Sequence, residues 1–372
     1  MKTKEELFSK LPKVKKTDKV IILSHTDLDG SGAIIVANLV FHNCSHIHCG
    51  NAEMSEKIYD CISLINKDKL YDFVIATDIS VNEETAVKIN EEFGDCNNFV
   101  ILDHHKTALH LNNYDWAVVE PELVKDSFRA KYYDLESDKQ MLSSGTSLFF
   151  DYLDYIGIVD SEESHSDIPL FVHQVATYDT FNWKNYFKEE RKESKCVQLN
   201  DIFIACGQDV FETRYIEHLR DSYMKMGSGY YDLCYKFYQE NDLLLLIQEE
   251  KKRKYLDRVK QNGCLKYKLY YKGNEYSLSV LLGGDYLSDT FDLLKEISPS
   301  DVYAIHYFIG TSEQISLRSD VIDVSEFAKY FGGGGHPAAA GFTIPYDKKY
   351  SQMKEIYGNT PYPNYSDYIF II

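Results

Sequence analysis

The chain has 372 residues, a formal net charge of −18 and a hydrophobic share of 44%. This length exceeds one typical domain of about 100 to 200 residues, so we expect two domains, each with its own core. The acidic charge argues against an extended groove for long nucleic acid, because such grooves depend on many Lys and Arg contacts to phosphates. The sequence lacks an apolar run of roughly 18 residues and a secretory signal, so we expect a cytoplasmic protein that binds no membrane.

The cysteine and histidine pattern favours neither disulfides nor a zinc site. Eight cysteines are scattered without a CxxC pair, and in a reducing compartment this predicts buried thiols and no disulfides. His42, Cys44, His46 and His48 alternate in the manner of a zinc-binding strand. No second Cys/His pair completes four ligands, so the sequence predicts no metal site there.

Three short apolar runs in the first half of the chain predict buried strands, at residues 20–23, 73–77 and 99–102. Each run ends in acidic or histidine residues and is followed by a helical stretch, which is typical of an open parallel sheet. A further strand is predicted at residues 46–50 and a helix at 54–64. Ligands of such sheets bind beyond the carboxyl ends of the strands, which is where the acidic residues fall.

The remaining sequence predicts helices and then a second domain. One helix is expected to start near Ser143 or Ser144, and another runs from about residue 170 into a loop that holds Asp179. Hairpin signals follow around residues 272–274, with a further strand pair at 301–319. We therefore predict an α/β protein with a parallel-sheet catalytic domain, a linker helix, a smaller α+β domain and a tail, and an active site in the cleft between the domains. The predicted boundaries are 1–240, 241–262, 263–347 and 348–372.

The acidic residues at the predicted strand ends point to cations. In the segment His25-Thr-Asp27-Leu-Asp29, three ligand types alternate; taken alone, these aspartates could simply cap the next helix. Asp78 and Asp103 follow two neighbouring strands, and such clustered carboxylates repel one another unless cations bind between them. Oxygen ligands mixed with imidazole suit Mn²⁺, while Mg²⁺, Fe²⁺ and Co²⁺ stay open. Two ions about 3.5 to 4 Å apart can clamp a phosphoryl oxygen, so we predict a two-ion phosphoesterase site.

A glycine run near the C-terminus has the composition of a phosphate-binding loop. Residues 332–335 are four successive glycines, followed by His336 and Pro337. Such a run costs backbone entropy, and its amides can approach a phosphate closely, especially where a helix begins after Pro337. The alternative is a flexible loop with an incidental histidine.

Four segments together resemble the signatures of the DHH phosphoesterase superfamily: HTDLDG at 25–30, TDIS at 77–80, DHH at 103–105 and GGGGHPAAAGF at 332–342. The resemblance covers about residues 18 to 345 and includes the glycine-rich DHH-associated C-terminal domain. Within the superfamily, the chain is similar to the branch of nano-RNases, RecJ-type exonucleases and cyclic-dinucleotide phosphodiesterases. It differs from the inorganic pyrophosphatases, which lack the glycine run. The compact length is closest to the oligoribonuclease type.

The resemblance implies roles for individual residues. Asp78 would bridge the two ions, Asp103 would orient a histidine, and His105 would contact the scissile phosphate or assist the leaving group. The assignment of Asp179 as a metal ligand rests on a loose sequence motif, and Asp201 and Asp209 stay open as alternative ligands. The implied metal ligands are His25, Asp27, Asp29, Asp78, His104 and Asp179. The implied substrate-binding residues are Arg318, Gly333, Gly334, Gly335 and His336.

The implied activity is hydrolysis of short single-stranded RNA or DNA oligonucleotides to mononucleotides. Three other activities stay open: hydrolysis of a cyclic dinucleotide, hydrolysis of phosphoadenosine phosphate, and RecJ-like digestion of longer single strands. A catalytically silent interaction module is the alternative outside the enzymes. The sequence does not decide between a monomer and a homodimer.

Overall fold

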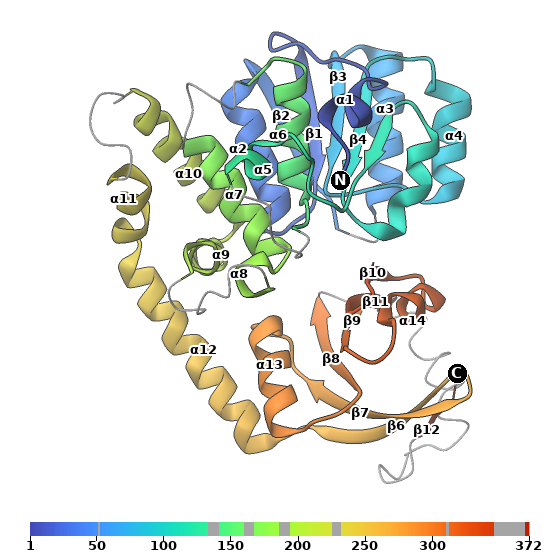
Figure 1. Ribbon diagram of the computed structural model, residues 1–372, viewed down its shortest axis with the longest axis vertical. Coiled ribbons are helices and arrows are strands. Elements are labelled where there is room, and N and C mark those ends of the chain that lie inside the picture. The colour runs from blue at the N-terminus through green and yellow to red at the C-terminus, as the bar shows by residue number, and fades with distance from the viewer. Residues whose placement is uncertain are drawn as a thin grey trace. The chain divides into compact units, whose positions relative to one another are not determined.

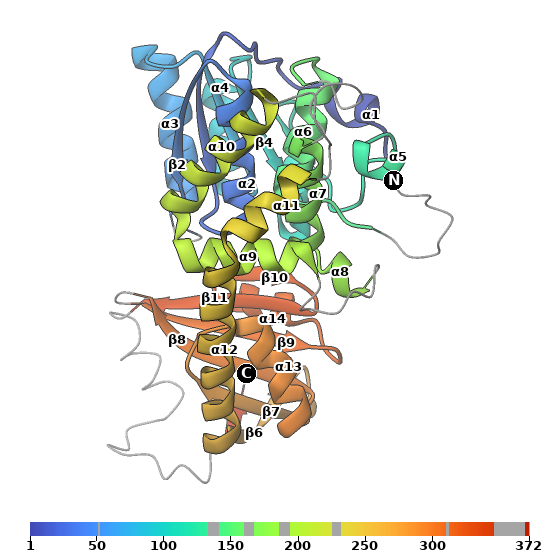
Figure 2. The same cartoon turned by 90° about the vertical axis from the view of Figure 1, so that its left-hand side faces the viewer.

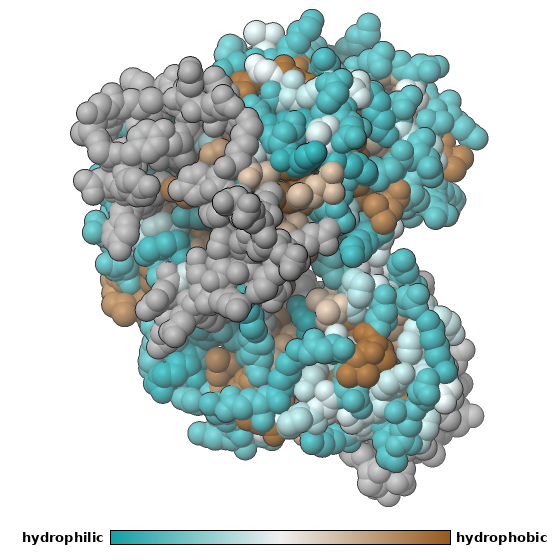
Figure 3. Space-filling model, viewed as in Figure 1, coloured by the Kyte–Doolittle hydropathy of each residue, from teal (hydrophilic) through white to brown (hydrophobic). Residues whose placement is uncertain are grey.

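The computed structural model describes residues 1–50, 53–132, 141–159, 167–185, 194–224, 232–309, 312–345 and 369–371. The chain divides into two compact units, Met1–Gln248 and Glu249–Ile372. The division falls within helix α12 (Asp242–Asn262), in the stretch where the sequence predicts a linker helix. Within the described ranges, every helix is too short or too polar to cross a membrane. Where Figure 3 is coloured by hydropathy, the surface is largely hydrophilic, with separate apolar patches.

The first unit is built on a parallel sheet of five strands in the order β2-β1-β3-β4-β5 (Figure 1). The predicted α/β fold with a parallel sheet is therefore confirmed. Successive crossovers place the carboxyl ends of β1, β3 and β4 at the same edge of the sheet. The strands are β1 (Lys19–Ser24), β2 (Asn43–His48), β3 (Phe73–Thr77), β4 (Phe99–Asp103) and β5 (Ala117–Val119).

The apolar runs are continuous because successive side chains of a strand point to opposite faces of the sheet, and both faces are buried. In β1, Val20 and Ile22 belong to one core, and Ile21 and Leu23 belong to the other. Helices cover both faces of the sheet: α2 (Leu28–Val40) packs with the first core, and α3 (Met54–Asp68) packs with the second (Figure 2). Strands buried on both sides have no polar face, so the sequence shows no period of two.

The other helices of the first unit follow the same pattern. Two of them matter for the site: α6 (Gly145–Tyr155), whose N-cap is Ser144 as predicted, and α7 (Asp167–Asp179). Asp179 is the last residue of α7, so the prediction that a loop holds it was wrong. The remaining helices are α1 (Lys4–Phe8), α4 (Glu83–Phe93), η1 (Lys106–Asn113), α5 (Phe128–Tyr132), α8 (Asn182–Asn185), α9 (Lys195–Cys206), α10 (Gln208–Met224) and α11 (Asp232–Glu240).

The second unit contains a mixed sheet of seven strands in the order β10-β11-β9-β8-β7-β6-β12. The predicted hairpin turns at Lys272 and Gly273, which both have positive φ, as a tight two-residue turn requires. Helices α13 (Leu287–Ile297) and α14 (Val324–Tyr330) complete the unit. The strands are β6 (Leu265–Tyr271), β7 (Asn274–Leu282), β8 (Val302–Ile309), β9 (Ser312–Ser319), β10 (Gly334–His336), β11 (Ala339–Pro345) and β12 (Ile369–Ile371).

The prediction that a helix begins after Pro337 was wrong, because β10 turns there and pairs with β11. The glycines serve this hairpin: a Cβ on Gly333 would lie 2.1 Å from the carbonyl oxygen of Gly341, and Gly335 has a φ of +134°. The predicted tail, residues 348–372, lies outside the described residues except for β12, which pairs in parallel with β6.

Candidate metal centre

The loop between β1 and α2 brings His25 and Asp27 together. Asp27 is the N-cap of α2, and its Oδ1 accepts a hydrogen bond of 3.0 Å from the Gly30 amide, while its Oδ2 lies 2.8 Å from Nδ1 of His25. Because the cap of α2 uses only Oδ1, Asp27 can cap the helix and still offer Oδ2 as a metal ligand. Burial raises the pKa of Asp27, but the neighbouring His25 imidazole outweighs it and lowers that pKa. Gly30 is required here, since a Cβ would lie 2.1 Å from the His25 carbonyl oxygen.

Asp78 follows β3 in an unusual backbone conformation. Its φ is +61°, in the left-handed region that Asp tolerates better than most residues, and its amide donates to the Leu102 carbonyl at 3.0 Å. Helix α6 packs directly behind it: a Cβ on Gly145 would lie 2.4 Å from Cβ of Asp78. The resulting position leaves Oδ2 of Asp78 buried without a hydrogen-bond partner among the described residues.

Asp29 is held by the N-terminus of α6. Its carboxylate accepts hydrogen bonds from the amides of Gly145 at 2.7 Å and Thr146 at 3.0 Å, and it is only 2% exposed. The free amides and positive end of a helix stabilise a negative charge, so this buried carboxylate is compensated. Sequence reasoning missed this contact, although the small residues of SSGTS mark a helix start that a second segment can approach closely.

His104 connects the carboxylates of three other segments. Its Nε2 lies 3.2 Å from Asp78 Oδ1, 3.8 Å from Asp29 Oδ2 and 3.7 Å from Asp179 Oδ2. Burial and the nearby charge of His105 lower the pKa of His104 to about 4. The ring is therefore neutral at neutral pH, which is the form that binds metal ions.

Asp103 contacts both histidines that follow it in the chain. Its Oδ1 accepts a hydrogen bond of 2.7 Å from the His104 amide and lies 2.8 Å from Nδ1 of His105. Asp103 Oδ2 is buried without a hydrogen-bond partner among the described residues. Burial lowers the pKa of His105, yet the Asp103 carboxylate outweighs it and raises that pKa to about 9. His105 is the more exposed of the two histidines, with 34% of its side chain accessible.

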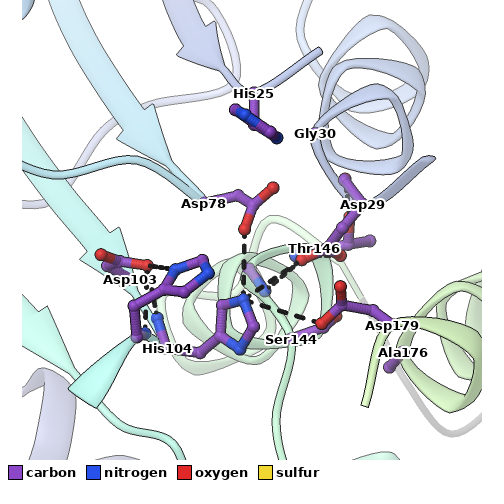
Figure 4. Close-up of polar contacts among 12 residues, drawn as sticks. His25, Asp29, Gly30, Asp78, Asp103, His104, Ser144, Thr146, Ala176 and Asp179 are labelled. Atoms are coloured by element: carbon purple, nitrogen blue, oxygen red, sulfur yellow. Dashed lines mark hydrogen bonds and ion pairs between the residues drawn. The ribbon is translucent and has the colours of Figure 1, made fainter. Parts of the chain in front are cut away.

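The predicted ligands gather in two adjacent groups, and Figure 4 shows His25, Asp29, Asp78, His104 and Asp179 among them. Potential ligand atoms of His25, Asp27 and Asp78 all lie within 4.8 Å of one another, and so do those of Asp29, His104 and Asp179. Asp78 belongs to the first group and links it to the second, because its Oδ1 lies 3.2 Å from Nε2 of His104. Among the described residues, neither Asp201 nor Asp209 takes part in these groups.

The pKa values of the clustered carboxylates indicate that positive charge would stabilise the site. Burial and the neighbouring carboxylates, Asp29 first among them, raise the pKa of Asp78 well above its ordinary value. The pKa of Asp179 is raised for the same two reasons. Crowded, buried carboxylates with an unbonded oxygen are stabilised by cations, and the mixed oxygen and imidazole donors fit a divalent metal. The residues present therefore fit the metal ions that the sequence predicts.

Comparison with known proteins identifies the family. Residues 284–358 match the DHHA1 domain. The chain is 30% identical over 326 residues to the oligoribonuclease NrnB of Bacillus subtilis strain 168, an alignment that covers 87% of this chain and 72% of the relative. The chain belongs to the DHH phosphoesterase superfamily. The predicted family is thereby confirmed, with an oligoribonuclease as a relative.

Two solved structures have weaker likeness to this DHH protein. A pGpG-specific phosphodiesterase, PggH from Vibrio cholerae, has a TM-score of 0.42 and 12% identity, covering 91% of this chain and 97% of its own. RecJ in complex with Mn²⁺ from Thermus thermophilus has a TM-score of 0.42 and 14% identity, covering 97% of this chain and 54% of its own. At this level of similarity, neither structure informs the function of the chain.

In this DHH protein, the interaction of Asp103 with His105 gives a titration that can be measured. In metal-free protein, we expect the His105 ring to titrate near pH 9, and Asp103→Asn to lower that midpoint toward the ordinary histidine value of about 6.5. Because the folded pKa is raised, this pair stabilises the fold below about pH 6.5, and the contribution is lost as pH rises through 9. Histidine ring NMR signals report the midpoint.

The control for this measurement is Asp68→Asn, at an exposed position at the end of α3. A His105 midpoint that is unchanged by Asp103→Asn would show that Asp103 does not set the charge of this ring.

Proposed function

We propose that this chain is a metal-dependent phosphodiesterase that hydrolyses short single-stranded oligonucleotides to mononucleotides. The observation that carries the proposal is the convergence of carboxylates and histidines at the ends of neighbouring strands, with the buried Asp78 linking two ligand groups. The 30% identity to an oligoribonuclease supports this choice of substrate. The proposed ions are two, with Mn²⁺ preferred for the mixed oxygen and imidazole donors.

The proposed metal ligands divide between the two groups. His25 and Asp27 would hold one ion, Asp29, His104 and Asp179 the other, and Asp78 would bridge them. When bound, the ions supply Lewis-acid stabilisation of the phosphoryl oxygens and lower the pKa of water. The protein contributes the geometry, since the helix start at α6 fixes Asp29 and the left-handed turn fixes Asp78.

His105 is the proposed proton donor. Asp103 contacts its Nδ1 and, in the metal-free chain, raises its pKa to about 9, which favours a protonated ring at neutral pH. The water oxygen bonds to phosphorus and releases one proton to solvent, while the bond from phosphorus to the leaving ribose oxygen breaks. The leaving oxygen takes the proton from His105, which then regains a proton from solvent. Partial exposure of the ring leaves it accessible to a substrate.

Within the second unit, Arg318 and His336 are proposed to bind phosphate. Strand pairing places Ala339 opposite both residues, on β9 and β10 respectively, so the two side chains leave the same face of the sheet with one methyl group between them. The Arg318 guanidinium lies 4.7 Å from the ring centre of Phe291 and donates to the Leu317 carbonyl at 2.8 Å. Burial lowers its pKa to about 10, which still leaves the group charged at neutral pH.

Replacement of Arg318 by Gln is expected to raise KM for short oligonucleotides about 10- to 100-fold, the equivalent of one charge-assisted hydrogen bond of about 1.5 to 3 kcal/mol. Steady-state kinetics with di- to pentanucleotides measures this change. Arg253→Gln, at an exposed arginine on α12, is the control that should leave KM unchanged. Equal KM values for the two variants would remove Arg318 from the proposed site.

The direct test of function is Mn²⁺-dependent hydrolysis of 5′-labelled RNA and DNA oligomers from two to about twenty-four nucleotides. Cyclic dinucleotides and phosphoadenosine phosphate are assayed in parallel. Fastest cleavage of dimers to pentamers supports the proposal. Preference for a cyclic or small nucleotide would indicate the same chemistry on another substrate. Preference for long strands would indicate a RecJ-like activity. No turnover with any substrate would favour a catalytically silent interaction module.

A further inference from the structure

A second cluster of metal-binding side chains lies on the edge strand of the parallel sheet. His46 and His48 are two residues apart on β2, so both side chains leave the same face of the strand. The sequence offered no partner for them, but helix α10 brings Glu212 to the same place. Potential ligand atoms of these three residues all lie within 4.8 Å of one another.

The carboxylate of Glu212 lies between the two imidazoles. Its Oε1 is 3.0 Å from Nε2 of His48, and its Oε2 is 3.8 Å from Nε2 of His46. The ring centroids of the histidines are 5.5 Å apart. Each residue therefore presents one donor atom toward a common space.

An ion pair between His48 and Glu212 is the simplest explanation for this cluster, but it leaves His46 without a hydrogen bond to the carboxylate. Glu212 is buried, with 5% of its side chain exposed. Glu212 Oε1 and His48 Nε2 are 3.0 Å apart, and both atoms are buried with no hydrogen-bond partner besides each other among the described residues. Nε2 of His46 lies 3.8 Å from Glu212 Oε2, beyond hydrogen-bond distance, whereas a cation held by all three residues would use every one of these donor atoms.

The other nitrogen of His48 is held as metal-ligating histidines usually are. Its Nδ1 lies 3.1 Å from the backbone carbonyl oxygen of His25, and a proton donated there leaves the lone pair on Nε2. The side-chain nitrogen of Gln208, which can only donate, lies 2.8 Å from the same Nδ1 and 3.1 Å from Ser31 Oγ. Turning this amide by half a rotation presents its oxygen to the Nδ1 proton, so Gln208 is compatible with the same tautomer.

We propose that His46, His48 and Glu212 bind one transition-metal ion such as Zn²⁺, at a site separate from the two-ion centre. Two imidazoles and one carboxylate are a known zinc donor set that leaves a fourth position for water. Ca²⁺ and Mg²⁺ are disfavoured because they prefer oxygen ligands throughout. His46, with 39% of its side chain exposed, gives the ion a path from solvent.

An ion at this site would fasten the edge strand β2 to helix α10. It would also fix His48, and through its contact with the His25 carbonyl it would support the loop that carries His25 and Asp27. The role implied is therefore structural or regulatory.

The test counts zinc bound to the full-length protein by equilibrium dialysis against Zn²⁺ and elemental analysis. Wild type is compared with His46→Asn and Glu212→Gln, and with His42→Asn, an exposed histidine just before β2, as the matched control. All four proteins keep the same two-ion centre, so differences in count report the second cluster. We expect wild type and His42→Asn to bind one more zinc ion per chain than the other two variants.

Equal zinc counts in all four proteins would overturn the proposal and leave an ion pair between β2 and α10. Because Glu212 is buried, its variant is accompanied by circular dichroism, and the half-exposed His46 variant decides the result if Glu212→Gln does not fold. Zinc is counted directly, so the result is independent of whether the chain hydrolyses oligonucleotides.

Discussion

Asp78→Asn is expected to reduce turnover by at least about 10³-fold, because loss of an outer partner of a metal ligand already costs about 10- to 100-fold and Asp78 is proposed to bridge both ions. Asn is the informative replacement, since it retains the size of the side chain and tolerates the φ of +61°. The measurement is kcat with a short oligonucleotide under saturating Mn²⁺. Asp68→Asn, at an exposed aspartate, should keep wild-type turnover.

The same variant should behave in the opposite way in a stability measurement. The pKa of Asp78 is raised well above its ordinary value by burial and neighbouring carboxylates, so its charged form is unfavourable in metal-free protein at neutral pH. A neutral Asn removes that cost, and urea unfolding of metal-free Asp78→Asn should show an unchanged or higher midpoint. Near-normal turnover, or loss of folding, would contradict the proposed bridging role.

Gly145→Ala is expected to damage the site although Gly145 holds no metal. The added Cβ would lie 2.4 Å from Asp78 Cβ, 2.7 Å from its Cα and 2.9 Å from its backbone nitrogen, and backbone atoms cannot rotate away. Misplacement of a catalytic group by about 1 Å can cost about 10²-fold in rate, and overpacking costs about 1 to 3 kcal/mol of stability. We therefore expect a loss of turnover on the order of 10²-fold and a lower urea midpoint.

Mn²⁺ affinity separates a site effect from general instability in this variant. Affinity is measured below the unfolding transition, where Gly145→Ala is still folded, and it should be weaker than in wild type. Gly50→Ala is the control, because a Cβ there meets nothing within 4 Å. Wild-type Mn²⁺ affinity and turnover in Gly145→Ala would show that α6 does not position Asp78.

The sequence predicted the residues that gather at the strand ends because of a general property of parallel sheets. Runs such as residues 20–23 and 99–102 are apolar on both faces, and the residues that follow such strands meet at one edge. His25, Asp78 and His104 could therefore be placed near one another without any structure. Their exact ligand roles remain predictions.

The parts that could not be predicted depend on contacts between distant segments. Neither the left-handed turn at Asp78 nor its packing on Gly145 leaves a periodic signal, and Glu212 reaches His48 only through the fold of α10. The prediction of a helix after Pro337 was wrong for a related reason. Pairing of β10 with β11 decides that the backbone is extended after residue 333, and local glycine content does not.

The proposed ligands come from four separate segments: the β1–α2 loop with the first turn of α2, the end of β3, the end of β4 and the end of α7. Ions bound among them would act as removable cross-links between parts of the chain far apart in sequence. Since binding to the folded state alone adds stability that grows with ligand concentration, the resistance of this chain to unfolding should follow the supply of free metal. Chelation would then do more than stop turnover, because it would also expose the chain to proteases.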